Sequence, residues 1–291
     1  MMHRSGFVNI LGNPNVGKST LMNSLVGEKL SIITSKSQTT RHRIMGIVSG
    51  EDFQIVYSDT PGILNPKYLL QESMMRAVAG ALEDADLLIY VTDVIESVNK
   101  NSEYLERIIN SPVDKIIVIN KIDLTSSEKL DRLFDRWSII TPGTDIIPVS
   151  AVKNFNVDNL LNLVLSKLPE GPAYFPKEQL TDRYERFFVS EIIREKILKY
   201  YKKEIPYSVE VEIEEYREEK NLTRIRAIIH VARESQKGIL IGHKGSRLKR
   251  VGSDARADIE TFTGIKVFLE LFVKVTREWR NDKQSLKNFG Y

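Results

Sequence analysis

The residues with the most specific spacing lie near the start of the chain and predict a phosphate-binding site. They follow the pattern Gly-x-x-x-x-Gly-Lys-Ser, between an apolar run at residues 7–11 and a helix-like segment at residues 18–26. The backbone N–H groups of such a loop and the helix N-terminus point to one place, which favours an anion there. The residues predicted to contact phosphate are Gly12, Asn13, Pro14, Asn15, Val16, Gly17, Lys18, Ser19 and Thr20.

Three side chains with oxygen atoms are candidates for the ligands of a Mg²⁺ ion. Ser19 ends the glycine-rich pattern, and Asp59 follows a strand-like segment at residues 54–58. A threonine hydroxyl from the polar segment 37–41 is expected to complete the set when a nucleoside triphosphate is bound. The sequence does not distinguish Thr39 from Thr40, and we prefer Thr40. The second motif consists of Asp59, Thr60, Pro61 and Gly62.

Three groups are the candidates for catalysis of phosphoryl transfer. Lys18 is expected to reach the β- and γ-phosphates, Thr40 to contact the metal, and the backbone N–H of Gly62 to approach the γ-phosphate. The next residue is Ile63, whose side chain cannot hydrogen-bond to an attacking water molecule. Many enzymes with such a loop have a glutamine at this position, which orients the attacking water. Because this chain lacks it, we expect slow intrinsic hydrolysis, as in a molecular switch.

Two further motifs predict that the nucleotide base is guanine. Asn120-Lys121-Ile122-Asp123 follows an apolar strand at residues 115–119. A carboxylate there can accept two hydrogen bonds from guanine, whereas adenine would leave it unpaired, so an ATPase is disfavoured. The other motif, Ser150-Ala151-Val152, is expected to donate a backbone N–H to the guanine carbonyl. The candidate base-binding residues are Asn120, Lys121, Asp123, Ser150, Ala151 and Val152.

A glycine-containing loop in the last third of the chain predicts contact with single-stranded RNA. The pattern Gly-x-x-Gly lies between two helix-like segments, where glycines allow a nucleic-acid backbone to approach closely. Basic residues follow the loop and can neutralise phosphates. The candidate RNA-binding residues are Ile241, Gly242, His243, Lys244, Gly245, Arg247, Lys249 and Arg250.

Charge is distributed unevenly along the chain. Its 291 residues carry a formal net charge of +3 and no cysteine, which excludes disulfides and thiolate metal sites. Residues 1–180 hold 18 Lys/Arg against 21 Asp/Glu, a balance of −3, whereas residues 181–291 hold 24 against 18, a balance of +6. A polyanion partner fits the second part, although charge alone does not distinguish it from a solvated surface. No apolar run is long enough to span a membrane, and no secretory signal is expected.

The order of apolar and periodic segments predicts two domains. Strand-like and helix-like segments alternate up to residue 168, which predicts an α/β domain with a mostly parallel sheet and helices on both faces. Residues 43–49 and 54–58 are expected to form a hairpin that adds an antiparallel edge strand. We place a GTP-binding domain at residues 1–170, a linker at 171–181 and a smaller α+β domain at 182–291. The latter starts with a long helix at residues 181–203 and continues in the order α-β-β-α-α-β, as in type II KH domains.

Taken together, the motifs resemble the translation-factor-like class of P-loop GTPases, and the whole chain resembles the bacterial Era family. The quoted segments are Gln38-Thr39-Thr40-Arg41-His42-Arg43, Asp59-Thr60-Pro61-Gly62, Asn120-Lys121-Ile122-Asp123 and Arg277-Glu278-Trp279-Arg280. The resemblance implies GTP, GDP and Mg²⁺ as ligands and the 3′ end of small-subunit ribosomal RNA as partner. It further implies a role in small ribosomal subunit biogenesis.

The resemblance also bears on location and assembly. It implies a monomer in the cytoplasm, with peripheral association at the inner face of the cell membrane. The alternative function is a GTP hydrolase whose C-terminal domain mediates protein contacts instead of binding RNA. The basic residues around positions 244–256 argue against that alternative.

Overall fold

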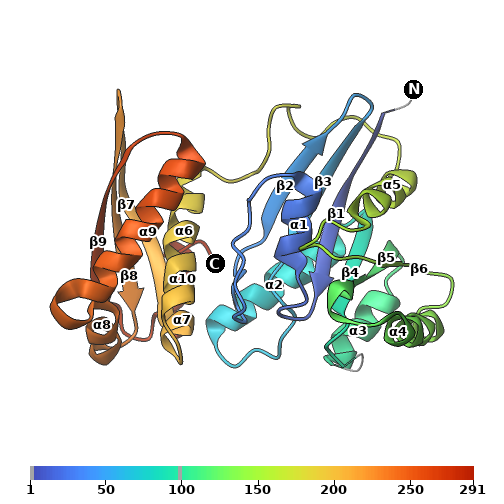
Figure 1. The fold of residues 1–291 in the computed structure, drawn as a ribbon, viewed down its shortest axis with the longest axis horizontal. Coiled ribbons are helices and arrows are strands. Elements are labelled where there is room, and N and C mark those ends of the chain that lie inside the picture. The colour runs from blue at the N-terminus through green and yellow to red at the C-terminus, as the bar shows by residue number, and fades with distance from the viewer. Residues whose placement is uncertain (1–2, 98–99) are drawn as a thin grey trace. The chain divides into compact units, whose positions relative to one another are not determined.

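The computed structural model describes residues 3–97 and 100–291, and the chain divides into two compact units (Figure 1). The first unit comprises Met1–Pro66 and Ser73–Asp182, and the second comprises Lys67–Glu72 and Arg183–Tyr291. Met1 and Met2, where the predicted first domain starts, lie outside the described residues. No helix in the described part of the chain is long and apolar enough to cross a bilayer.

The first unit contains a six-stranded sheet with the strand order β2-β3-β1-β4-β5-β6. All neighbouring strands are parallel except β2 and β3. Every residue of β4 is buried, so both faces of the sheet are covered, as expected for a parallel sheet. The elements from β1 to α5 belong to this unit, except that the start of α2, up to Glu72, belongs to the second unit. They are β1 (Arg4–Gly12), α1 (Lys18–Val26), β2 (Ile44–Ser49), β3 (Phe53–Asp59), α2 (Leu69–Glu83), β4 (Leu87–Asp93), α3 (Ser102–Ile109), β5 (Asp114–Asn120), η1 (Ile122–Leu124), α4 (Ser127–Ile140), β6 (Asp145–Pro148) and α5 (Val157–Lys167).

The predicted hairpin is present, and β2 is the edge strand of this sheet. A later stretch of chain lies along the outer side of β2. Thr181 forms a bridge with Gly46, and the N–H of Ile47 donates to the carbonyl of Leu180 at 2.8 Å. The segment that we predicted as a linker is therefore hydrogen-bonded to the first unit near its C-terminal end.

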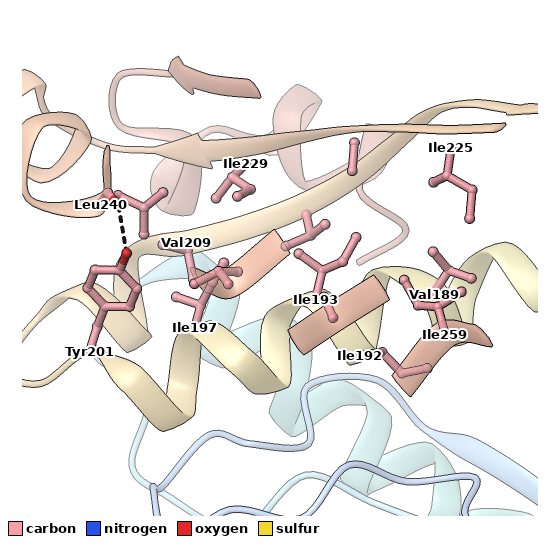
Figure 2. Close-up of a cluster of buried hydrophobic side chains, with 14 of the residues drawn as sticks. Val189, Ile192, Ile193, Ile197, Tyr201, Val209, Ile225, Ile229, Leu240 and Ile259 are labelled. Atoms are coloured by element: carbon pink, nitrogen blue, oxygen red, sulfur yellow. Dashed lines mark hydrogen bonds between the residues drawn. The ribbon is translucent and has the colours of Figure 1, made fainter. Parts of the chain in front are cut away.

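The second unit contains a three-stranded sheet with the order β7-β8-β9, in which β8 pairs antiparallel with β7 and parallel with β9. Helices α6, α8 and α9 contribute apolar side chains to one core with this sheet (Figure 2). The elements are α6 (Glu185–Tyr200), α7 (Ile205–Ser208), β7 (Val209–Glu219), β8 (Leu222–Val231), α8 (Glu234–Ile241), η2 (His243–Gly245), α9 (Ser246–Thr263), β9 (Val267–Val275), η3 (Trp279–Asn281) and α10 (Lys283–Asn288). The predicted order α-β-β-α-α-β is confirmed, with the short helices α7 and α10 as additions.

The long helix predicted at residues 181–203 is shorter in the structure. Helix α6 starts at Glu185 because Thr181 and Asp182 bind strand β2 instead of capping a helix. The hydroxyl of Thr181 donates to the carbonyl of Met45 at 2.7 Å, and the carboxylate of Asp182 accepts from the N–H of Met45 at 3.1 Å. At the other end the chain turns extended at Tyr201, so α6 stops three residues earlier than expected.

The C-terminal segment after β9 is anchored by an aromatic residue. Trp279 is fully buried, donates its indole N–H to the carbonyl of Ser208 at 3.1 Å, and packs edge-on against Phe289. Buried tryptophans usually pair their N–H in this way. The Arg-Glu-Trp-Arg segment thus holds α10 against the second unit.

Candidate functional site

The phosphate-binding loop has the backbone shape that its glycines predict. Gly12 and Gly17 adopt φ values of 146° and 97°, which side chains with a Cβ rarely tolerate. A Cβ on Gly12 would lie 2.2 Å from the carbonyl oxygen of Val91, and one on Gly17 would lie 2.3 Å from the amide nitrogen of Asn120. Both positions therefore need glycine for steric reasons as well. The neighbouring predicted residues in this loop and in the first turn of α1 are Asn13, Pro14, Asn15, Val16 and Thr20.

Lys18 is held inside this loop before any ligand is considered. Its side chain is buried, and Nζ donates to the carbonyl oxygens of Gly12 at 3.0 Å and Asn13 at 2.9 Å. Burial lowers the pKa of Lys18 to about 8, and the nearby carboxylates of Asp59 and Glu96 partly oppose this shift. The ammonium group is thus positioned at the loop and would gain stability from an added anion.

The three predicted metal ligands converge on one point. The hydroxyl of Ser19 donates to the carboxylate of Asp59 at 2.6 Å, and the hydroxyl of Thr40 lies 2.9 Å from Ser19 and 3.2 Å from Asp59. Asp59 is fully buried, which raises its carboxyl pKa, and its Oδ1 atom lacks a hydrogen-bond partner among the described residues. Such a set of oxygen atoms, with one carboxylate, fits Mg²⁺, which is usually bound by one or two carboxylates plus phosphate oxygens.

Thr39 and Thr40 differ clearly in what they contact. The hydroxyl of Thr39 donates to the carbonyl of Lys36 at 2.6 Å and lies 2.6 Å from the hydroxyl of Thr34. The Thr39 hydroxyl thus forms hydrogen bonds with residues of its own segment, whereas the Thr40 hydroxyl contacts Ser19 and Asp59. The geometry favours Thr40 as the metal-binding threonine.

The motif after Asp59 brings backbone atoms close to the phosphate-binding loop. A Cβ on Gly62 would lie 2.7 Å from the Cα of Pro14, so only glycine allows this approach. The hydroxyl of Thr60 donates to the carbonyl of Ile10 at 2.7 Å and fixes the motif, which continues through Pro61. Ile63 donates its backbone N–H to the carbonyl of Gly12 at 3.2 Å, and its side chain is buried.

Asn120 connects three of the predicted motifs. Its amide nitrogen donates to the carbonyl of Val16 at 2.9 Å, and its amide oxygen accepts from the N–H of Ala151 at 3.1 Å. Lys121 donates from Nζ to the carbonyl of Asn15 and to the carboxylate of Asp93, both at 2.5 Å. Asp93 was not among the predicted residues, although its place at the end of the buried strand β4 was a usable signal.

The predicted base-binding groups lie side by side. The hydroxyl of Ser150 donates to the carboxylate of Asp123 at 2.5 Å, which leaves the exposed carboxylate in a fixed position. The backbone N–H groups of Ser150 and Ala151 donate to Phe155 and Asn120, respectively, and the side chain of Val152 is exposed. A cavity of about 350 Å³ adjoins the phosphate-binding loop and is lined among others by Lys18, Thr40, Gly62 and Lys121.

The predicted RNA-binding loop of the second unit also contains residues with positive φ. Gly242 and Gly245 have φ values of 73° and 75°, and Lys244 between them has a φ of 49°. The loop ends α8 and starts α9, so the first N–H groups of α9 have no carbonyl partner within the helix. His243 and Lys244 are exposed, and Ile241 is partly buried.

The cations in and after this loop have no carboxylate partner in the described chain. Among the described residues, no ion pair involves His243, Lys244, Arg247, Lys249 or Arg250. Arg256, further along α9, pairs with Glu260 at 3.6 Å. The positive charge beside the loop is therefore available for an anion from outside the chain.

Comparison with known proteins matches parts of both units to known families. The model of a 50S ribosome-binding GTPase family matches residues 7–121, and the KH domain model matches residues 204–280. A GTPase Era from Staphylococcus epidermidis is 44% identical over 291 residues, covering 99% of this chain and 97% of its own length. One from Alkaliphilus oremlandii is 44% identical and covers 100% of both chains. The chain belongs to the Era family of GTPases.

Solved structures of Era proteins have the same fold. A crystal structure of Era in complex with MgGDPNP and nucleotides 1506–1542 of 16S ribosomal RNA is 39% identical, with a TM-score of 0.95 and 99% coverage of both chains. A single-residue variant of Era from Aquifex aeolicus bound to GDP·AlF4⁻ gives the same identity, TM-score and coverage. The predicted family, fold class and GTPase activity are thereby confirmed.

Proposed function

We propose that this protein is a GTP-controlled switch that binds the 3′ end of small-subunit ribosomal RNA and acts in small ribosomal subunit biogenesis. One observation carries the proposal: a preorganised phosphate-binding loop and a Gly-x-x-Gly loop flanked by exposed cations occur in one chain of the Era family. A family member of similar sequence has been crystallised with MgGDPNP and nucleotides 1506–1542 of 16S ribosomal RNA. The ligands that we propose are therefore GTP or GDP, Mg²⁺ and single-stranded RNA.

We assign the nucleotide phosphates to the loop at residues 12–20 and the metal to Ser19, Thr40 and Asp59. These three oxygen-bearing side chains would hold a Mg²⁺ ion, which would neutralise negative charge on the phosphates. Lys18 contributes a second positive charge beside the loop carbonyls that now hold it. When the γ-phosphate is lost, Thr40 and Gly62 lose their partner, which releases their segments.

We infer that hydrolysis depends on Lys18 and on backbone amides more than on a general base. Lys18 and the N–H of Gly62 stabilise the charge that develops on the γ-phosphate. Ile63 follows Gly62 but buries its side chain, so it does not orient the attacking water. Slow intrinsic turnover is the expected consequence.

We assign guanine recognition to Asp123, which accepts from two guanine donors while Ser150 keeps the carboxylate in place. Asn120 ties the base-binding and phosphate-binding loops together. The stem of Lys121 covers the base, because its ammonium group is fixed by Asn15 and Asp93. The remaining proposed contacts are those of Ala151 and Val152.

The proposal extends to organisation and location. We propose a GTP-binding domain at residues 1–170, a linker at 171–181 and an RNA-binding KH domain at 182–291. By resemblance to the family, the protein acts as a monomer in the cytoplasm and contacts the inner face of the membrane only peripherally. The family model described as a 50S ribosome-binding GTPase matches residues 7–121. This match does not include the Gly-x-x-Gly loop, so it does not indicate which ribosomal subunit the loop binds.

Replacing His243 and Lys244 by aspartate tests the RNA-binding part of this proposal. In the full chain we expect H243D/K244D to lose binding to a fluorescently labelled RNA with the sequence of nucleotides 1506–1542 of 16S ribosomal RNA, because two phosphate-binding groups become anions. Binding of a fluorescent GDP analogue is the internal control for folding and should stay unchanged. RNA affinity equal to that of the unmodified protein would refute the assignment and favour a C-terminal domain for protein contacts.

A further inference from the structure

The second unit contains a second cavity, of about 590 Å³, that none of the predicted motifs identified. Three segments form its walls: the end of α6 with the residues that follow it, the end of α8, and the first turns of α9. A cavity of this volume is in the range that small ligands occupy. We call it the α6–α9 cavity; it is lined by Tyr200, Tyr201, Lys202, Lys203, Glu204, Ile205, Ile239, Arg247 and Arg250.

The frame of the α6–α9 cavity is fixed by the core. Tyr201 is buried, and its hydroxyl donates to the carbonyl of Leu240 at 2.6 Å, which joins the end of α6 to the end of α8 (Figure 2). Ile205, which also lines the cavity, is buried as well. Between them Lys203 has a φ of 55°, an uncommon conformation for a residue with a side chain. Strained residues of this kind often occur at functional sites.

The lining of the cavity is strongly basic. Lys202, Lys203, Arg247 and Arg250 contribute four positive charges, against one negative charge from Glu204. All four cations are exposed, and in the described part of the chain none of them forms an ion pair with a carboxylate. Four like charges around one cavity repel each other, so a bound anion would stabilise this arrangement.

Two arginines on the sheet of the same unit have carboxylate partners. On the sheet, Arg224 pairs with Glu219 at 3.0 Å, and Arg226 lies within 4 Å of three glutamates, the nearest being Glu270 at 3.6 Å. Each of these arginines also lies over a phenylalanine ring of β9. The four cations of the α6–α9 cavity differ from these two arginines because they lie around one cavity and form no ion pair with a carboxylate of the described chain.

The cavity also offers apolar and aromatic surface. The guanidinium of Arg250 lies over the ring of Tyr200, 4.4 Å from its centroid, and the hydroxyl of Tyr200 is hydrogen-bonded to Asp254. This pair is thus already oriented. Ile239 adds an apolar side chain that is 40% exposed. Tyrosine rings, guanidinium planes and aliphatic side chains are the groups on which RNA bases stack or pack.

The α6–α9 cavity is continuous with the Gly-x-x-Gly loop. A Cβ on Gly242 would lie 2.7 Å from Cγ of Arg247, so the stem of Arg247 lies directly on the first glycine of the loop. The same residue lines the cavity. A strand held at the loop therefore reaches the cavity without crossing other parts of the unit.

We propose that the α6–α9 cavity is a subsite for one further nucleotide of the bound RNA strand. Lys202, Lys203 and Arg247 contact its flanking phosphates, and Tyr200 with Arg250 and Ile239 contacts its base. This proposal rests on the RNA binding proposed above and extends it beyond the loop. A phosphate of a free mononucleotide has the same chemistry, so the test distinguishes the two sources.

The salt dependence of RNA binding tests the phosphate contacts. The double variant K202A/K203A removes two exposed cations, and a 16S-derived single-stranded RNA is titrated against the full chain at several salt concentrations. Loss of two phosphate contacts should reduce the steepness of the plot of log K against log salt concentration by about 1.4. If the variant and the unmodified protein bind RNA equally at 1 M salt, this change corresponds to about 25-fold weaker binding by the variant at 0.1 M salt. The variant K220A/K287A is the matched control, since it removes two exposed lysines that do not line the cavity.

Shortening the RNA tests the base contact. With the unmodified protein, removal of the nucleotide that occupies the cavity should cause one clear drop in affinity, and this drop should be absent in the variant I239S. Unchanged slopes for K202A/K203A, or a drop that persists in I239S, would overturn the proposal. Binding of 5′-AMP that K202A/K203A abolishes, with an unchanged RNA slope, would assign the cavity to free nucleotides instead.

The outcome is separable from that of the proposed function. If H243D/K244D retains RNA affinity, the RNA-binding function itself fails. If H243D/K244D loses RNA affinity while K202A/K203A behaves like the K220A/K287A control, only the cavity proposal fails.

Discussion

The two anion sites of this protein are built in opposite ways. At the phosphate-binding loop the lysine is buried, is held by two carbonyl oxygens and has Asp59 as a nearby countercharge. At the Gly-x-x-Gly loop and the α6–α9 cavity the cations are exposed and have no carboxylate partners in the described chain. A buried charge must be compensated before the ligand arrives, whereas an exposed one is solvated by water.

This difference predicts different ligand selectivity. Buried, preoriented groups discriminate strongly, because a wrong ligand leaves them unpaired in a medium of low polarity. Exposed cations attract any polyanion, and their contribution decreases with salt. The first site is thus suited to one nucleotide, and the second to a long polyanionic strand.

The largest expected effect is that of Lys18→Ala. It removes the buried charge at the γ-phosphate, and we expect the rate of GTP hydrolysis to fall by about 10²- to 10³-fold. Single-turnover measurement of phosphate release gives this rate. The exposed counterpart, Lys244→Ala, should leave it unchanged and weaken only RNA binding. Equal effects of both variants on hydrolysis would contradict the separation of the two sites.

Asp123→Asn should change which base is accepted. The amide cannot accept both guanine donors, so we expect GTP affinity to fall by about 10- to 100-fold, while xanthosine triphosphate binds better. Competition against a fluorescent GDP analogue measures both constants. Ser150→Ala keeps the carboxylate and is the milder control. Retention of full GTP selectivity in D123N would exclude Asp123 as the base-reading residue.

Thr40→Ala and Thr39→Ala form a matched pair for the metal site. Thr40 faces Ser19 and Asp59, so its loss should raise the Mg²⁺ concentration needed for GTP hydrolysis by about tenfold. The hydrogen bonds of Thr39 described above lie within its own segment, and T39A should leave the Mg²⁺ requirement close to that of the unmodified protein. A larger shift for T39A than for T40A would reverse the assignment.

The smallest predicted effect is a pH dependence of GTP affinity. Burial lowers the pKa of Lys18 to about 8, so the lysine of the empty site is charged below this pH and loses its proton above it. GTP binds the charged form, and affinity should therefore fall about fourfold between pH 7 and pH 8.5. Isothermal titration at both pH values measures the change. In K18A this pH dependence should disappear; its persistence would assign it to another group.

Sequence patterns predicted the motif residues well because those residues follow strand ends. In a parallel sheet the carboxyl ends of the strands meet at one edge, so Gly12, Asp59 and Asn120 come together once the strands are recognised. The structure does bring them together, although Asp93 at the end of β4 was overlooked. Roles assigned to individual site residues stay predictions until the variants are measured.

Other features depended on contacts that local patterns do not contain. Thr181 and Asp182 are good helix caps by type, but hydrogen bonds to Met45, more than 130 residues earlier, take them out of α6. The α6–α9 cavity arises where the ends of three helices meet, so Lys202 and Lys203 have no motif of their own. Tertiary contacts overrode local preference in the first case and created the cavity in the second.

The chain segment along β2 has a further consequence for the behaviour of the protein in concentrated solution. The open edge of a sheet can pair with the edge of another molecule and start aggregation. Strand β2 is such an edge, and the segment ending at Thr181 occupies its hydrogen-bonding groups through Gly46 and Ile47. The same stretch that leads into the second unit therefore shields the first from self-association.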